Sequence, residues 1–305
     1  MSVLRRPVPA IDSAAALRQA LEQIFPDEDI KLPPHSDALL RLHAALPDQR
    51  PATCGAYVLT YLLPAWGFEE LDGERLGAED YMAHLARVTI SAREDPVTYR
   101  FPVDSSADLS LQGTSPEGVA RAIAVATGGR LASIPVPGRT AGGRVQLDAG
   151  RWTALLDLVA PRFLEGGMDV VFNYETDQLL AARDEAYNAQ ALGRADASAL
   201  IPRDRWGVGH FAPMAALWHR PSGERWMVLL NSFKERAFAG CEPQPAELMR
   251  HAVVREDGRG GGVLLVVRNE AVERLIKEVE DVGLEVRMWN NGSPAPGDWR
   301  WRPGR

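Results

Sequence analysis

Apolar residues recur every three or four positions in several segments of the first half of the chain, a spacing typical of amphipathic helices. These segments run from Ile11 to about Phe25, from Asp37 to Ala45, from Leu76 to about Arg93 and from Ala149 to Phe163. A further helix is expected to begin at Ser115-Pro116, since serine is a favoured N-cap and proline suits the first helical position. Gly128-Gly129 should end it.

The second half of the chain is richer in the β-branched and aromatic residues that favour strands. Strands are expected over 130–136, 168–174, 210–218, 225–230, 263–267 and 284–289, with one amphipathic helix over 270–282. The turn residues Pro221-Ser222-Gly223 should join two of these strands in a hairpin. Helices followed mostly by strands predict an α+β fold, with an N-terminal helical half and a C-terminal antiparallel β half.

Composition shifts divide the chain into three parts. Residues 1–45 are expected to form a helical extension packed on the core, 46–289 the main domain, and 290–305 a tail rich in Pro, Gly and Trp. Within the main domain, 175–205 is rich in Ala and charged residues and is predicted to be an insertion, mostly helical, beside the substrate cleft.

Bulk composition excludes several classes of protein. A net charge of −7 over 305 residues argues against broad nucleic-acid binding. No run approaches 18 apolar residues and no secretion signal follows the N-terminus, so no membrane span is expected and the cytoplasm is the predicted compartment. Two cysteines, Cys54 and Cys241, make neither a disulfide framework nor a cysteine-rich zinc site, and no cofactor or metal is expected.

Cys54 stands where a polar loop meets a long apolar run that continues to Pro64. Thr53 is a plausible N-cap, so Cys54 should lie in the first turn of a buried helix. The positive end of that helix favours a thiolate, which predicts a nucleophilic cysteine. The alternative is a structural cysteine in a core helix, because free cysteines are often buried.

A nucleophilic thiol needs a base and a group that orients the base. His210 follows two glycines at the start of a predicted strand, and Asn231 ends the next strand of the hairpin, so both could approach Cys54. The remaining histidines are expected at the surface or at helix ends, and Cys241 in a loop.

Three motifs resemble the catalytic domain of phytochelatin synthases, a branch of the papain-like cysteine peptidases. They are Pro51-Ala52-Thr53-Cys54-Gly55 with Gln49 before it, Gly209-His210-Phe211-Ala212-Pro213-Met214, and Val228-Leu229-Leu230-Asn231 followed by Phe233-Lys234. The resemblance implies a papain-like fold in which Cys54 is the acyl-accepting nucleophile and His210 the general base. It places Asn231 where the family has Asp, and it implies that Gln49 and the Cys54 backbone N–H form the oxyanion hole.

These enzymes take glutathione, release glycine and pass the γ-glutamylcysteinyl group to another thiol peptide or to water. The resemblance therefore implies thioester-mediated transfer or hydrolysis of a small peptide or amide, with a glutathione-like γ-glutamyl peptide as the favoured substrate. Two alternatives stay open. One is a biosynthetic acyltransferase or amide synthase that receives its acyl group from a carrier protein, and the other is a non-catalytic binding protein that keeps the fold.

Overall fold

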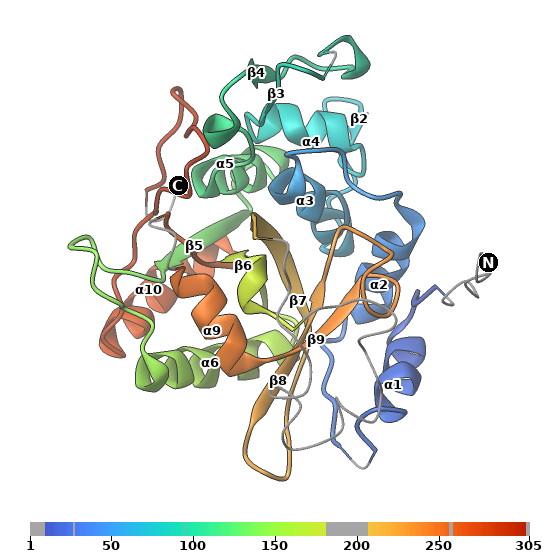
Figure 1. Ribbon diagram of the computed structural model, residues 1–305, viewed down its shortest axis with the longest axis vertical. Helices are drawn as coiled ribbons and strands as arrows, with labels where there is room; N and C mark the ends of the chain where they lie inside the picture. Colours follow the sequence, from blue (N-terminus) through green and yellow to red (C-terminus); the bar gives the residue numbers. More distant parts are fainter. Residues whose placement is uncertain (1–9, 27, 95, 181–206, 256–258, 303–305) are drawn as a thin grey trace.

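A six-stranded antiparallel sheet with helices on both sides organises the molecule (Figure 1). The computed structural model describes residues 10–26, 28–94, 96–180, 207–255 and 259–302. Eight α-helices lie within these ranges. The mixture of helices with an antiparallel sheet confirms the α+β class.

The helices begin and end close to the predicted positions in most cases. They are α1 (Ala14–Glu22), α2 (Ser36–Ala45), α3 (Cys54–Ala65), α4 (Glu79–Leu85), α5 (Pro116–Ala126), α6 (Ala149–Leu164), α9 (Ala246–Val254) and α10 (Val272–Asp281). Ser115 caps α5 as expected, since its side chain accepts the N–H of Gly118, and Pro116 occupies the first turn. Four short 3-10 helices connect other elements: η1 (Pro96–Thr98), η2 (Leu109–Leu111), η3 (Thr176–Gln178) and η4 (Asn269–Ala271).

The large sheet has the strand order β5-β10-β6-β7-β8-β9, and every neighbouring pair is antiparallel. Its strands are β5 (Leu131–Pro137), β6 (Met168–Glu175), β7 (Gly209–His219), β8 (Arg225–Leu230), β9 (Cys241–Pro245) and β10 (Gly262–Arg268). Two small sheets pair β1 (Glu70–Leu71) with β2 (Glu74–Arg75), and β3 (Thr89–Ser91) with β4 (Asp104–Ser106).

The predicted hairpin is present, because β7 and β8 pair along their length with His219 opposite Arg225 next to the turn. The start of β7 and the end of β8 therefore meet at the opposite end of the hairpin. His210 and Asn231 lie there, one near the start of β7 and the other directly after β8.

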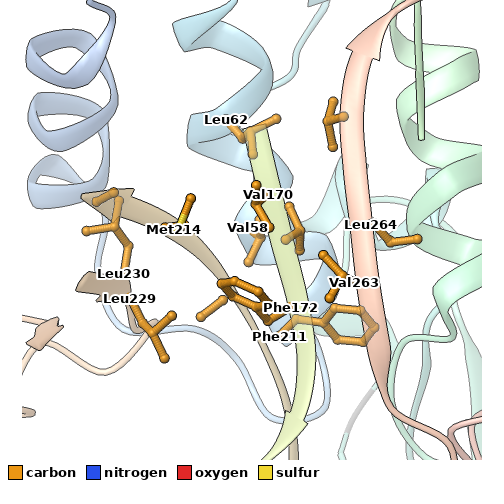
Figure 2. Close-up of a cluster of buried hydrophobic side chains, with 14 of the residues drawn as sticks. Val58, Leu62, Val170, Phe172, Phe211, Met214, Leu229, Leu230, Val263 and Leu264 are labelled. Atoms are coloured by element: carbon orange, nitrogen blue, oxygen red, sulfur yellow. The ribbon is translucent and has the colours of Figure 1, made fainter. Parts of the chain in front are cut away.

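Helix α3 is apolar on all sides and packs between the large sheet and the neighbouring helices α4 and α5. Its residues from Cys54 to Leu63 are all buried. Figure 2 shows Val58 and Leu62 of α3 in one buried cluster with Met214 and Phe211 of β7. Helices α3, α4 and α5 gather on one side of the sheet, whereas α6, α9 and α10 lie on the other (Figure 1).

Gly55 permits the contact between α3 and α5. A Cβ at this position would lie 2.8 Å from Val119 and 2.9 Å from Thr114, closer than real side chains approach. The glycine that follows the candidate nucleophile is therefore required by packing.

Three of the predicted elements differ from the structure. The helix predicted over 76–93 spans only α4, because Arg87 adopts a left-handed conformation (φ 54°) and turns the chain into β3. The segment 284–289 is no strand: the N–H of Glu285 binds the Gln146 side chain and that of Arg287 binds Pro135. Cys241 lies at the start of a strand, β9, and is fully buried rather than in an open loop.

The predicted N-terminal extension and the main domain share one hydrophobic core. Leu17 and Leu21 of α1 and Leu39 and Leu40 of α2 belong to the same buried cluster as α3 and the sheet. Antiparallel strands and helices also alternate in the second half, since α9 and α10 follow β9 and β10. Most of the predicted 175–205 insertion lies outside the described residues, and so does its proposed relation to the cleft.

The segment after Trp289 packs against the rest of the molecule through side chains. Asn291 donates from Nδ2 to the carbonyl of Thr114 at 3.0 Å, and Trp301 donates from Nε1 to the carbonyl of Ser133 at 2.7 Å. Among the helices of the described ranges, none has the length and apolar character needed to cross a membrane.

Candidate active site

Cys54 is the first residue of α3, in the predicted place, but the loop before it is held differently than expected. Thr53 makes no side-chain cap to the helix. Its hydroxyl instead lies within hydrogen-bond distance of the Arg50 carbonyl and of Glu79 Oε1, and the same Glu79 oxygen accepts the Arg50 N–H at 2.8 Å. A carboxylate on α4 therefore fixes the loop that leads into the cysteine.

The Cys54 thiol is buried, with 8% of the residue exposed. Burial raises its pKa to about 11, although backbone N–H groups, including that of Phe211, hydrogen-bond to the sulfur and oppose the rise. The expected lowering of this pKa by the helix N-terminus is therefore outweighed by desolvation. The hydrogen bond with Phe211 places the sulfur beside the residue that follows His210.

The His210 ring is enclosed by side chains from three segments. Its Nε2 lies 3.3 Å from Ser232 Oγ, and the Asn231 side chain also hydrogen-bonds to the ring. Phe233 stacks on the ring at 6.2 Å between centroids, and Tyr174 meets it edge-on at 5.8 Å. Burial, together with the positive charge of Arg236, lowers the pKa of His210 to about 3, so the resting imidazole is neutral.

Asn231 is held by its backbone and its side chain together. Its N–H donates to the Gly240 carbonyl at 2.7 Å, and its Oδ1 accepts the N–H of Phe233 at 3.0 Å. The carbonyl of Asn231 lies 2.8 Å from Nε2 of His43, a buried residue of α2. His43 was expected at the surface or a helix end; it lies in the last turn of α2, but it is buried rather than at the surface.

Gln49 lies at the cavity with Cys54 and His210. Its N–H donates to the carbonyl of Ser232 at 3.3 Å, which ties the loop before Cys54 to the end of β8. Its Oε1 is buried and finds no hydrogen-bond partner within the described part of the chain. The structure thus gathers all four predicted site residues: three line one cavity, and Asn231 lies behind His210.

The cavity has a volume of about 780 Å³ and carries charged side chains on one wall. Arg255 Nη2 lies 2.8 Å from Glu175 Oε2, and both residues are buried. Arg259 also lines the cavity. Gly209 makes room for Arg255, because a Cβ there would lie 2.7 Å from Nη1 of the arginine.

Other lining residues come from the segment between η2 and α5 and from the segment after Trp289. Gly113, Thr114, Asn291 and Ser293 all line the cavity. Ser293 Oγ donates to the Gln112 carbonyl at 3.1 Å, so the late segment supports the wall beside Cys54.

Sequence reasoning missed Glu79, Glu175, Arg255 and His43. Glu175 directly follows the predicted strand 168–174, which is a signal, but a charged residue next to a strand end is common. Arg255 follows α9 in a left-handed conformation (φ 52°), and no local pattern predicts that its side chain turns inward. The described residues contain no group of three or more His, Cys, Asp or Glu arranged to hold a metal ion.

Fold and cavity together define an α+β protein in which a cysteine, a histidine and an asparagine meet beside a charged pocket. A family model described as a family of unknown function (DUF6885) matches residues 33–290. The chain belongs to this family. None of the curated proteins matches it.

Proposed function

We propose that this protein is a papain-like thiol enzyme that transfers or hydrolyses the acyl group of a small peptide or amide through a thioester on Cys54. The observation that carries the proposal is the joint placement of Gln49, Cys54 and His210 on one cavity, with the Asn231 side chain bonded to His210 from behind. The helix that carries the cysteine packs on the sheet that carries the histidine, which supports a papain-like arrangement.

In the first half of the reaction, Cys54 Sγ attacks the substrate carbonyl while His210 takes the thiol proton. Gln49 and the Cys54 N–H stabilise the oxyanion of the tetrahedral intermediate. When the C–N bond breaks, His210 returns the proton to the departing amine and a thioester remains. In the second half, His210 takes a proton from water, a thiol or an amine as it attacks. The C–S bond then breaks and His210 gives that proton to the sulfur, which restores the Cys54 thiol.

The pKa directions define the resting protonation states of the proposed pair, from which the thiol proton leaves only as the sulfur attacks. Burial raises the pKa of Cys54 to about 11 and lowers that of His210 to about 3, so the resting pair is a neutral thiol and a neutral imidazole. The neutral imidazole is the form that accepts a proton. Burial weakens His210 as a base, and the hydrogen bond with Asn231 opposes that effect by raising its pKa.

The charged wall supports a small zwitterionic substrate. Glu175 and Arg255 form a buried ion pair on the cavity, and Arg259 adds a second cation to its lining. A glutathione-like γ-glutamyl peptide carries both an ammonium and carboxylates, so it offers a partner to each kind of group. The cytoplasm, where such peptides and reduced thiols coexist, stays the predicted compartment.

Intact-mass analysis of acid-quenched mixtures tests the proposal. We expect glutathione or a related γ-glutamyl amide to add an acyl group to the protein and to the Cys241→Ala variant, but not to Cys54→Ala. An adduct formed from small acyl thioesters and never from amides would favour the carrier-dependent acyltransferase. If neither kind of substrate gives an adduct on Cys54, the enzyme proposal is wrong and the binding protein is favoured.

A further inference from the structure

A buried histidine of α2 lies directly behind the proposed catalytic cluster. His43 is fully buried and is not among the residues that line the cavity. Its Nε2 lies 2.8 Å from the carbonyl oxygen of Asn231. A carbonyl only accepts, so Nε2 carries the proton and donates it to Asn231.

The ring of His43 is fixed by packing as well as by this hydrogen bond. It meets the ring of Tyr61 on α3 edge-on, with 5.1 Å between the centroids. On its other side lies Gly240, where a Cβ would be 3.0 Å from Cε1 of the histidine and 2.8 Å from the Asn231 carbonyl oxygen. Burial lowers the pKa of His43 to about 3, with the charge of Lys234 contributing, so the donor is the neutral ring near pH 7.

Asn231 therefore has its peptide groups held on both sides. Gly240 accepts its N–H at 2.7 Å, His43 donates to its carbonyl, and the N–H of Phe233 binds its Oδ1 at 3.0 Å. The side chain of Asn231, anchored in this way, hydrogen-bonds to the His210 ring. Of the three partners, only His43 contributes a side chain, so only its bond can be removed by substituting the partner.

We propose that His43 is a positioning residue, which acts through Asn231 to keep the His210 imidazole directed at Cys54. The inference rests on the proposed function, since it assigns His43 a role in that reaction. It also gives α2, outside the cavity, a part in the chemistry.

The test measures alkylation of Cys54 by iodoacetamide from pH 6 to pH 11, in a Cys241→Ala background so that one thiol reports. His43→Gln places an amide N–H near the position of Nε2, whereas His43→Asn stops short of it and His43→Phe keeps the ring without a donor. Leu40→Ala, another buried position of α2, is the control for stability alone.

Near pH 7 alkylation depends on His210 as base, and near pH 11 it depends on the free thiolate. We expect His43→Phe and His43→Asn to slow alkylation at pH 7 about tenfold while leaving the rate at pH 11 unchanged. Asn231→Ala should do the same, and His43→Gln should stay within about twofold of the parent. Leu40→Ala should lower the unfolding temperature but keep the pH profile.

A His43→Asn profile that superimposes on the parent, while Asn231→Ala is slowed, would overturn the role of His43. If Asn231→Ala also keeps the parent profile, the orienting role of Asn231 fails and the inference fails with it. If no acyl adduct forms but His43→Asn still slows alkylation at pH 7, only the proposed function is wrong, because alkylation needs no substrate.

Discussion

At the scale of single residues, Glu79 has two opposing effects on Cys54: it holds the loop before the cysteine, and it disfavours the thiolate. Its carboxylate fixes the loop before Cys54 through the Arg50 N–H and the Thr53 hydroxyl. Its negative charge also contributes to the raised pKa of the Cys54 thiol. The carboxylate thus gives structure to the loop and disfavours a resting thiolate.

Replacing Glu79 by Gln should separate these two effects. The amide oxygen can still accept both hydrogen bonds, but the charge is gone, so we expect the pKa of Cys54 to fall. The pH profile of iodoacetamide alkylation measures the pKa of Cys54. Glu70→Gln, which removes an exposed carboxylate, is the control. An unchanged profile would show that the charge of Glu79 does not reach the sulfur.

Ala52, two residues before Cys54, adopts a left-handed conformation (φ 65°) that costs free energy in any residue with a Cβ. We expect Ala52→Gly to raise the free energy of unfolding by about 0.5–1 kcal/mol, measured by urea denaturation. Ala20→Gly, within α1, should lower it by about 1 kcal/mol. Equal losses in both variants would mean that Ala52 is unstrained.

At the scale of elements, the contact between α3 and α5 sets the position of the nucleophile. Gly55→Ala would force Val119 and Thr114 away from α3, and we expect a loss of about 1–3 kcal/mol in unfolding free energy. The same variant should slow formation of the Cys54 adduct. Gly77→Ala is the matched control, because its nearest neighbour would be 3.7 Å from the new Cβ, and it should be tolerated.

The elements that carry the candidate site were predictable because each has a strong local pattern. The apolar run after Cys54 and the hairpin turn before Arg225 are signals within a few residues of sequence. Strand β9 has no such signal: its sequence contains two prolines and two polar residues, and pairing with β8 overrides that composition. Segment 284–289 is the opposite case. Its residues are typical of a strand, but its N–H groups bind Gln146 and Pro135 and it forms no strand.

Contacts between residues distant in the sequence could not be predicted from local sequence patterns. Glu79 meets Thr53 from another helix, and His43 meets Asn231 across 188 positions. A buried ion pair such as Arg255–Glu175 likewise depends on how two segments meet. The sequence therefore predicts the groups of the proposed chemistry, and the structure adds the groups that hold them.

At the scale of the whole molecule, buried histidines predict acid sensitivity. His43 and His210 have pKa values of about 3 when folded, against the ordinary 6.5 when unfolded. The unfolded chain therefore binds more protons below pH 6.5, and the free energy of unfolding should fall as pH drops from 6.5 toward 3. Each group contributes about 1.4 kcal/mol per pH unit in this window.

Urea unfolding at several pH values measures this slope. His43→Gln should reduce the slope of unfolding free energy against pH by the contribution of one histidine. An unchanged slope would mean that His43 binds a proton in the folded protein. His35 acts in a different window: despite the opposing effect of burial, its bond with Asp169 raises its pKa. Its contribution is complete below pH 6.5 and is lost as pH rises through the raised value.

The position of β10 in the sheet has a consequence for how the protein is made. This strand pairs on one edge with β5 and on the other with β6, although it follows β6 by more than eighty residues in the chain. During synthesis on the ribosome, the strand that lies between β5 and β6 is missing until residues 262–268 have emerged. Four strands can assemble early, but β5 and the helix packed on it must wait, so apolar surface stays open to chaperones until late in synthesis.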